Sequence, residues 1–224
     1  MKKVVAAVIL TISIFTIVGC MTGKKKKVIF FGDSITQLGV EPGGYIDLMN
    51  KILAEKNKSE NFELIGSGIS GNKVYDLYLR LEEDVLAKKP DIVVIWIGVN
   101  DVWHKLSMGT GTDADKFAKF YTAIIKKLQT QNISVLLATP AVIGEKYDNS
   151  NQQDEDLDLY STIIRQLAMQ YKCGLCDLRK LFMYYEQQNN KENKIFGMLT
   201  NDGVHLNAKG NELVAETMFN FITK

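Results

Sequence analysis

Short apolar runs alternate with helical patterns along most of this chain, and this alternation limits the folds open to it. Apolar side chains such as Val74, Leu77 and Leu81 follow the spacing of amphipathic helices. The apolar runs between the helical patterns have the length of strands buried on both faces, and they lie at residues 28–31, 62–65, 92–97, 135–138 and 175–178. The pattern predicts an α/β fold: a single doubly wound, flavodoxin-like domain with a five-stranded parallel sheet and helices on both faces.

The N-terminal segment has a different composition. Lys2 and Lys3 precede a mostly apolar run at residues 4–18, which has the form of an export signal. The run ends Ile-Val-Gly-Cys at Cys20, which resembles the bacterial lipobox, where the cysteine is lipidated and becomes the new N-terminus. We therefore expect a lipoprotein signal peptide at 1–19, a lipidated, lysine-rich tether at 20–27 and the folded domain at 28–224.

An uncleaved helical anchor is the alternative to a lipidated cysteine. Either arrangement exports the domain and holds it at a bacterial membrane, on the periplasmic or outer-membrane face or at the cell surface. The sequence leaves open which membrane carries the anchor.

Charge is divided unevenly along the chain. Six of the 27 basic residues and none of the 26 acidic residues lie in the first 27 positions, so residues 28–224 contain 21 basic and 26 acidic side chains. A nucleic-acid-binding domain needs a basic face. The mildly acidic domain therefore argues against a nucleic-acid partner, whereas the four lysines at 24–27 suit either anionic headgroups or solvent.

Polar residues follow three of the predicted strands and precede the last helical pattern. Ser34 comes after the first strand, Gly71 ends the loop after the second, and Asn100 follows the third. Asp202 and His205 stand shortly before the final helix. Each residue alone has a structural explanation as a helix cap or a turn. Because ligands of such sheets bind beyond the carboxyl ends of the strands, we expect the polar residues to share one edge.

The segments that contain these residues resemble the motif blocks of the SGNH, or GDSL, hydrolase family. They read FFGDSIT, GISGN, IGVND and DGVHLNAKG, in the family's order of serine, glycine, asparagine and histidine. The resemblance extends over the whole predicted domain, in an exported lipoprotein form, and the G-x-S-x-G elbow of α/β-hydrolases does not occur in the sequence. It implies a carboxylic ester hydrolase that needs no cofactor.

The residue types fit that chemistry. A serine hydroxyl is a weak nucleophile and needs a base within hydrogen-bond reach. His205 is the natural base for Ser34, because histidine titrates near neutral pH, and His104 is the competing histidine. Asp202 stands three residues before His205, a spacing that on a helical turn places both side chains on one side. The carboxylate can then orient the imidazole, so we expect Ser34, Asp202 and His205 to be catalytic.

The resemblance also assigns the oxyanion hole, the group of donors that binds the negatively charged oxygen of the tetrahedral intermediate. These donors are the backbone N–H groups of Ser34 and Gly71 and the side-chain amide of Asn100. Such a donor typically supplies roughly 3 to 4 kcal/mol of transition-state stabilisation. We expect Asp33 and Asp101 to brace the neighbouring turns.

The second segment also fits a nucleotide-binding pattern. Residues 66–71 read GSGISG, which satisfies G-x-G-x-x-G between a strand and a helix. A dinucleotide fold, however, places an acidic ribose ligand about 20 residues further on, at the end of the next strand. The first acid beyond that strand is Asp101, thirty residues after Gly71. We therefore expect no nicotinamide cofactor, and we expect Gly66 and Gly68 only to shape the turn that presents Gly71.

The substrate is constrained less tightly than the reaction. No long hydrophobic insertion is present to hold a fatty chain, which favours a short acyl group. Trp103 and His104 are candidate pocket residues, and Trp103 suits either stacking on a sugar ring or packing in the core. Similar family members deacetylate polysaccharides, so we expect acetyl removal from a carbohydrate through an acyl-serine. The alternatives are a lysophospholipase or thioesterase, and a catalytically silent glycan-binding protein on the same fold.

Cys173 and Cys176 form a C-x-x-C pair late in the chain. An exported protein allows a disulfide, and the sequence leaves open whether one forms. Thioredoxin-like redox pairs stand instead at the start of a helix after an early strand, so we expect no redox role here. The chain has two histidines and no ligand cluster, so we expect no metal site. The sequence does not indicate an oligomeric state.

Overall fold

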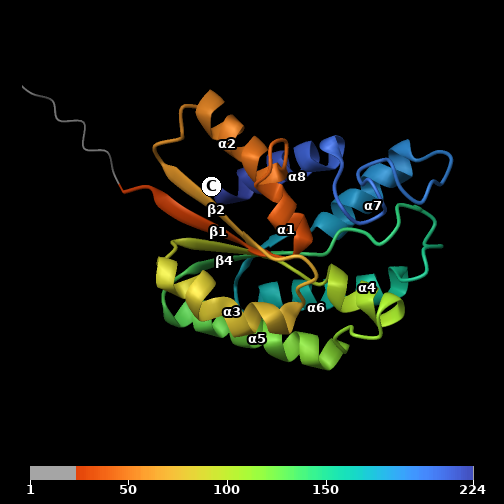
Figure 1. Cartoon of the computed structure of the whole chain (residues 1–224), viewed down its shortest axis with the longest axis horizontal. Helices are drawn as coiled ribbons and strands as arrows, with labels where there is room; N and C mark the ends of the chain where they lie inside the picture. The colour runs from red at the N-terminus through yellow and green to blue at the C-terminus, as the bar shows by residue number, and fades with distance from the viewer. Residues whose placement is uncertain (1–23, 224) are drawn as a thin grey trace, which may run out of the picture.

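A computed structural model describes residues 24–223 of the chain, so the predicted signal peptide and Cys20 lie outside the described residues. Five parallel strands form one sheet in the order β2-β1-β3-β4-β5 (Figure 1). The order in which successive strands are added to the sheet changes direction at β1, as in other doubly wound folds. The predicted fold class is confirmed. The strands are β1 (Lys26–Gly32), β2 (Phe62–Gly68), β3 (Ile92–Trp96), β4 (Ser134–Ala138) and β5 (Gly174–Cys176).

Helices cover both faces of the sheet (Figure 1). One face carries α1 (Ser34–Gly39), α2 (Tyr45–Glu55), α7 (Leu178–Asn189) and α8 (Ala208–Ile222). The other face carries α3 (Val74–Asp84), the 3-10 turn η1 (Leu86–Lys88), α5 (Ala114–Thr130) and α6 (Asp154–Gln170). The remaining helix, α4 (Val99–Ser107), contributes apolar side chains to both faces.

Alternate side chains of the central strands enter two separate cores. Phe30 and Trp96 pack beneath α2, where both contact the ring of Tyr45 edge-on. Phe31 and Ile95 point to the opposite core beneath α3 and α5. Burying a side chain of this size contributes about 1.5–3 kcal/mol. Two-sided burial explains why the central strands are almost continuously apolar.

The second strand is longer than predicted and contains two of the glycines expected in a turn. Gly66 and Gly68 pair with residues of β1, so the expectation that they shape a turn is wrong. A Cβ atom at Gly68 would lie 2.1 Å from the backbone nitrogen of Gln37, and one at Gly66 would lie 2.3 Å from Cγ1 of Val40. These glycines therefore allow α1 and the residues after it to pack closely on β2.

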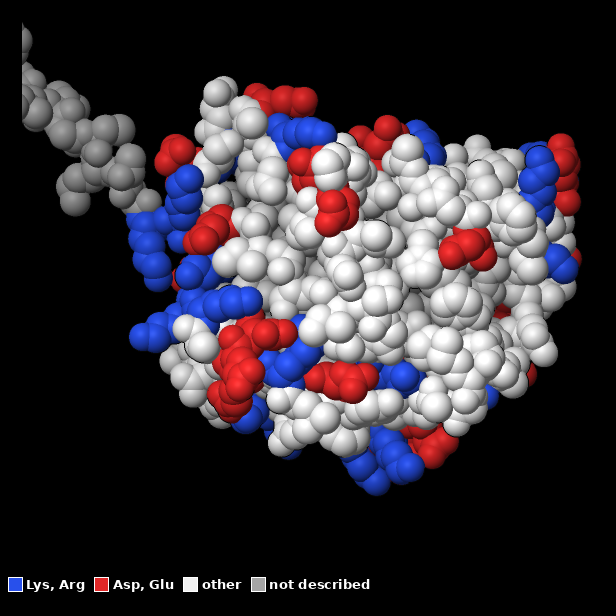
Figure 2. Space-filling view, viewed as in Figure 1, with Lys and Arg blue, Asp and Glu red and all other residues white. Residues whose placement is uncertain are grey.

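The two ends of β1 have different surroundings. β1 begins at Lys26, next to the predicted tether, and ends directly before Asp33 and Ser34. Lys and Arg side chains gather where β1 begins, at the left of Figure 2, while much of the middle of this face is uncharged. No helix within residues 24–223 combines the length and apolar character needed to cross a membrane.

Candidate active site

Ser34 is the first residue of α1, directly after the cap residue Asp33. The Asp33 carboxylate fixes this turn, because it accepts a hydrogen bond from the backbone nitrogen of Ile35 at 3.0 Å. Oγ of Ser34 lies 2.9 Å from Nε2 of His205, although 171 residues separate the two in sequence. The structure thus brings the predicted nucleophile within hydrogen-bond reach of the predicted base.

Asp202 completes a chain of hydrogen bonds behind the histidine. Its Oδ2 lies 2.7 Å from Nδ1 of His205, so the two ring nitrogens face Asp202 and Ser34. Partial burial acts to raise the pKa of Asp202, but hydrogen bonds from His205 and Val204 outweigh it and lower that pKa below its ordinary value. The carboxylate is ionised at neutral pH and can stabilise an imidazolium ion.

Asp202 and His205 do not lie on a helical turn, which corrects the prediction from their spacing. Gly203 between them has φ +91°, a left-handed conformation that a right-handed helix does not contain. The turn forms because Oδ1 of Asp202 accepts hydrogen bonds from the backbone nitrogens of Val204 at 3.0 Å and His205 at 2.8 Å. One carboxylate therefore shapes the turn through Oδ1 and orients the imidazole through Oδ2.

Gly71 and Asn100 follow the strands on either side of β1. Gly71 has φ +76°, and no heavy atom lies within 4 Å of the place where its Cβ would stand. The side-chain nitrogen of Asn100 donates to the carbonyl of Asn72 at 3.1 Å. An amide nitrogen carries two N–H donors, and the second one of Asn100 has no partner among the described residues. The two residues and Ser34 thus stand at adjacent strand ends, as an oxyanion hole requires.

Arg80, on α3, connects the same strand ends, and it was not predicted from the sequence. Its guanidinium donates to the carbonyls of Gly32 at 2.8 Å and Ser67 at 3.1 Å, and to Oδ1 of Asn72 at 2.8 Å. The group also lies over the ring of Phe31, 4.4 Å from its centroid. One side chain therefore joins β1, β2 and the loop that contains Gly71.

Glu145, in the chain after β4, holds the segment that leads to His205, and it was also not predicted from the sequence. Its carboxylate is fully buried. Oε2 accepts from the backbone nitrogen of Met198 at 2.7 Å, and Oε1 accepts from those of Leu199 and Thr200, each at 2.6 Å. These hydrogen bonds fix the start of the segment that leads to His205.

Two buried aspartates lie beneath the site. Burial raises the pKa of Asp33 to about 7, with the charge of Asp101 as a further cause. Burial also raises the pKa of Asp101 to about 6. The carboxylate of Asp101 accepts from the backbone nitrogen of Val74 at 3.2 Å, which joins α4 to the first residue of α3. Both carboxylates hold turns that carry the site.

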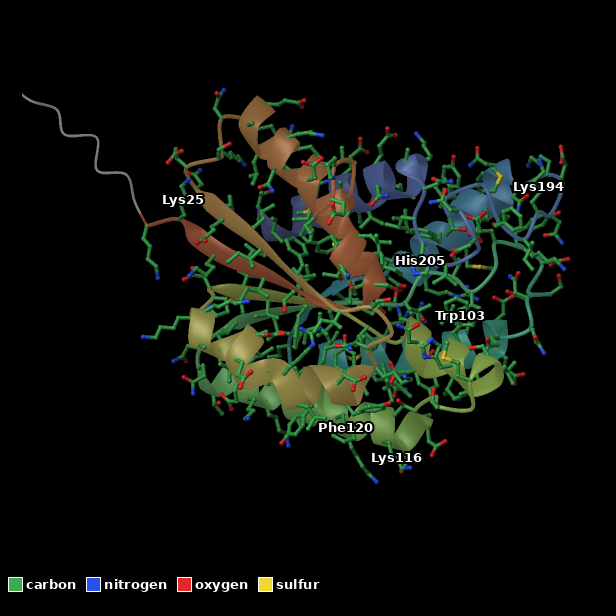
Figure 3. The ribbon with its side chains drawn as sticks, viewed as in Figure 1. Lys25, Trp103, Lys116, Phe120, Lys194 and His205 are labelled. Carbon is green, nitrogen blue, oxygen red and sulfur yellow. The ribbon has the colours of Figure 1, made fainter. Side chains whose placement is uncertain are left out.

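Trp103 lies beside His205 (Figure 3). Its ring centroid is 6.4 Å from that of His205, at an interplanar angle of 68°. His104 is buried, and its Nδ1 has no hydrogen-bond partner among the described residues. Burial and the charge of Lys73 lower the pKa of His104. Of the two histidines, His205 makes the hydrogen bond to Ser34.

Cys173 and Cys176 are free thiols in the structure. Burial raises the pKa of Cys173 to about 11 and that of Cys176 to about 12. The thiolate is the reactive form of cysteine, so both side chains are poor nucleophiles near neutral pH. Across residues 24–223, no group of three or more His, Cys, Asp and Glu side chains is arranged to hold a metal ion.

Comparison with known proteins identifies relatives of this site and fold. An acetylxylan esterase of Geobacillus stearothermophilus is 31% identical over 178 residues, which cover 71% of this chain and 79% of that protein. The crystal structure of an acetyl xylan esterase, AlAXEase, superposes with a TM-score of 0.87 at 63% identity and covers 88% of this chain and 99% of that one. YqeF, an uncharacterized lipoprotein of Bacillus subtilis, is 22% identical over 234 residues, covering 93% of this chain and 94% of that protein.

The family match agrees with the motif segments. A sequence model of the GDSL-like lipase/acylhydrolase family matches residues 30–213, a range that contains Ser34, Gly71, Asn100, Asp202 and His205. The family predicted from the sequence is confirmed: this chain belongs to the GDSL-like lipase/acylhydrolase family.

Proposed function

We propose that this chain is a serine ester hydrolase that removes acetyl groups from carbohydrate, with acetylated xylan as the substrate class. The observation that carries the reaction type is the continuous hydrogen-bond chain from Ser34 through His205 to Asp202, with distances of 2.9 and 2.7 Å. Membership of the family supports carboxylic ester hydrolysis. The two acetylxylan esterases among its relatives support the acetyl group and the glycan.

The geometry accounts for each step of acyl transfer. Nε2 of His205 accepts the hydroxyl proton as Oγ of Ser34 attacks the ester carbonyl, and Asp202 stabilises the resulting imidazolium. The backbone N–H groups of Ser34 and Gly71 and the free N–H of Asn100 bind the oxyanion. His205 then donates the proton to the leaving alcohol, which leaves an acetyl-serine. In the second half of the reaction, His205 takes a proton from water as the water oxygen attacks the acetyl-serine, and it returns the proton to Oγ of Ser34 as the bond to the acetyl group breaks and acetate is released.

The arrangement of the domain favours a glycan over a lysophospholipid, the alternative substrate. We propose that residues 1–19 are an export signal and that Cys20 carries lipid, a proposal that the likeness to the lipoprotein YqeF supports. Lys25 stands at one end of β1, and His205 lies near the other end (Figure 3). Seven strand residues span about 23 Å. An anchor on this side leaves the active site facing away from the membrane that holds it.

Two assays test the reaction and the substrate. Purified protein should react with a fluorophosphonate at Ser34, and Ser34→Ala should remove the labelling. Absence of labelling in folded protein would favour the catalytically silent glycan-binding alternative. Acetate released from acetylated xylan should exceed fatty acid released from lysophospholipid. The reverse result would assign the protein to the lysophospholipase alternative.

The oxyanion role of Asn100 has its own test. Asn100→Ala should lower kcat by ~100-fold or more, because it removes a fixed donor that acts in the transition state. An effect confined to KM would contradict that role. Incorporation of labelled palmitate, expected in the full chain and lost in Cys20→Ser, tests the anchor separately.

A further inference from the structure

The chemistry of His205 fixes the side on which the alcohol part of the substrate lies. The same Nε2 that takes the proton from Ser34 must deliver it to the leaving oxygen, so that oxygen lies within hydrogen-bond reach of Nε2. The alcohol therefore leaves the reacting carbon on the side of Ser34 that faces His205. This direction rests on the proposed function.

A cavity lies beside the histidine. Its volume is about 230 Å³, below the ~300–1,000 Å³ of pockets for drug-sized ligands, as suits one sugar ring. It adjoins Asp202, which contacts Nδ1 of His205, whereas Ser34 contacts Nε2. Trp103, whose ring centroid is 6.4 Å from that of His205, also lines the cavity, so two of its walls stand next to the histidine. The chain after β4 lines it with Ile143, Gly144, Asn151, Gln152 and Gln153, and the other walls are Trp103, Ile195, Asp202 and Val204.

The lining has an apolar part and a polar part. Trp103, Ile143 and Ile195 supply apolar surface, which suits the C–H face of a pyranose ring. The Gln152 side chain is exposed and makes no hydrogen bond to any residue in the described part of the chain. Its amide offers both a donor and an acceptor, which suits ring hydroxyl groups.

The polar residues on either side of Gln152 already make hydrogen bonds within the protein. Nε2 of Gln153 donates to the carbonyl of Val102 at 2.7 Å, and Nδ2 of Asn151 donates to that of Lys146 at 2.8 Å. The first contact holds the chain at 151–153 against α4, and the second closes the loop between residues 146 and 151. The cavity wall is therefore preorganised, and Gln152 is the member with a free side chain.

We propose that this cavity binds the sugar residue adjacent to the acetylated one, on the leaving-group side of the ester. The acetylated ring then lies over His205 and Trp103, and the neighbouring ring occupies the cavity between Trp103, Ile195 and Gln152. The enzyme consequently selects acetylated oligosaccharides over acetylated monosaccharides.

The test compares three substrates with the full-length protein: an acetylated xylo-oligosaccharide, an acetylated methyl xyloside and p-nitrophenyl acetate. Of the two acetylated sugars, the oligosaccharide should have the higher kcat/KM. Gln152→Trp, which fills the cavity mouth, should lower the ratio of kcat/KM for the oligosaccharide to that for p-nitrophenyl acetate by roughly tenfold, equivalent to about 1.4 kcal/mol. Gln170→Trp, the same change at an exposed position on α6, should leave that ratio unchanged.

The outcomes separate this inference from the proposed function. Hydrolysis of p-nitrophenyl acetate without acetate release from either sugar would overturn the proposed function, and the sugar site with it. Equal kcat/KM on the two sugars, or an unchanged ratio in Gln152→Trp, would overturn the sugar site alone. A ratio that falls equally in Gln170→Trp would also overturn it.

Discussion

The two halves of the active site are held in different ways. The strand half, with Ser34, Gly71 and Asn100, stands at the ends of three adjacent parallel strands. The loop half, with Asp202 and His205, lies in a segment without helix or strand that is closed by a single bridge. The sheet ladder determines the positions in the strand half, whereas side-chain hydrogen bonds determine those in the loop half.

Arg80 braces the strand half and Glu145 braces the loop half, and the two side chains have charges of opposite sign. Arg80 donates to oxygen atoms at the strand ends, and Glu145 accepts from backbone nitrogens before the histidine. The strand half also has a continuous ladder, whereas the backbone of the loop half is held by isolated hydrogen bonds, such as that from the nitrogen of Gly144 to the carbonyl of Gly203 at 2.8 Å. Glu145 should therefore matter more for catalysis than Arg80. The comparison teaches that a catalytic loop without regular structure depends on a few buried contacts.

The largest effect is expected from Glu145→Gln. An amide has one acceptor oxygen where the carboxylate has two, so at least one backbone N–H from Met198 to Thr200 loses its partner or faces another donor. The displaced segment misplaces His205, and a shift of about 1 Å can cost ~100-fold in rate. We expect kcat to fall by roughly that factor with little change in KM, measured on p-nitrophenyl acetate.

Glu186 supplies the matched control for this variant. It is a second fully buried glutamate, neither oxygen of which has a hydrogen-bond partner in the described part of the structure. Burial, with the charge of Glu145 as a further cause, raises the pKa of Glu186 to about 8. The side chain is therefore mostly neutral at pH 7, and Glu186→Gln should leave kcat nearly unchanged. Equal losses in the two variants would mean that burial, not positioning, explains the effect of Glu145→Gln.

A smaller effect is expected from Arg80→Met, which keeps the packing on Phe31 but removes the donors. Gly32 retains a hydrogen bond from the backbone nitrogen of Ile69 at 3.3 Å, and the β1–β2 ladder persists. We expect kcat to fall roughly tenfold, in line with the loss of charged hydrogen bonds at one end of a preserved sheet. Arg165→Met removes an arginine paired with Asp177 away from the site and should leave kcat unchanged. A larger loss in Arg80→Met than in Glu145→Gln would refute the ranking of the two halves.

The strand half could be predicted from the sequence because its residues follow apolar runs that have the length of buried strands. Ser34, Gly71 and Asn100 each come within a few residues of a strand end, and parallel strands bring those ends together. The roles of Gly66 and Gly68 were predicted wrongly, because a glycine required for close packing on a strand has the same appearance in sequence as one required for a turn.

The braces could not be predicted because the partners that connect them to the site are largely backbone groups. Arg80 contacts Gly32, 48 residues away, and Glu145 contacts Thr200, 55 residues away. Backbone N–H and C=O groups have no sequence signature, so neither brace forms a motif. The helical geometry assumed for Asp202 and His205 failed for a related reason, since the Asp202 carboxylate itself organises the turn.

The smallest effect on turnover, and the clearest on stability, is expected from Asp33→Asn. The pKa of Asp33 is raised from 3.8 to about 7 in the folded protein, so between pH 4 and 7 the folded state holds a proton that the unfolded chain has lost. Stability contributed by this group therefore falls as pH rises through that window, by at most ~4 kcal/mol. Asparagine is neutral throughout and can still accept from the backbone nitrogen of Ile35.

The two halves should respond to pH in opposite directions, which makes Asp202→Asn the natural counterpart. The pKa of Asp202 is lowered, so its stabilising contribution is present above its ordinary pKa and is lost as pH falls. Urea unfolding at pH 4.5 and pH 8 should show that Asp33→Asn is more stable than wild type at pH 8. Part of the fall in stability with rising pH should remain in this variant, because the pKa values of Asp101 and Glu186 are also raised. Asp202→Asn should be less stable than wild type at both of these pH values and should converge on wild type only as pH falls below 3.8, the ordinary pKa of aspartate. If Asp33→Asn keeps the wild-type dependence of unfolding free energy on pH, Asp33 is ionised across the window and its burial does not hold the proton. The strand half would then contain an ionised aspartate directly beside its nucleophile, and its rigidity would depend on that charge as strongly as the loop half depends on Glu145.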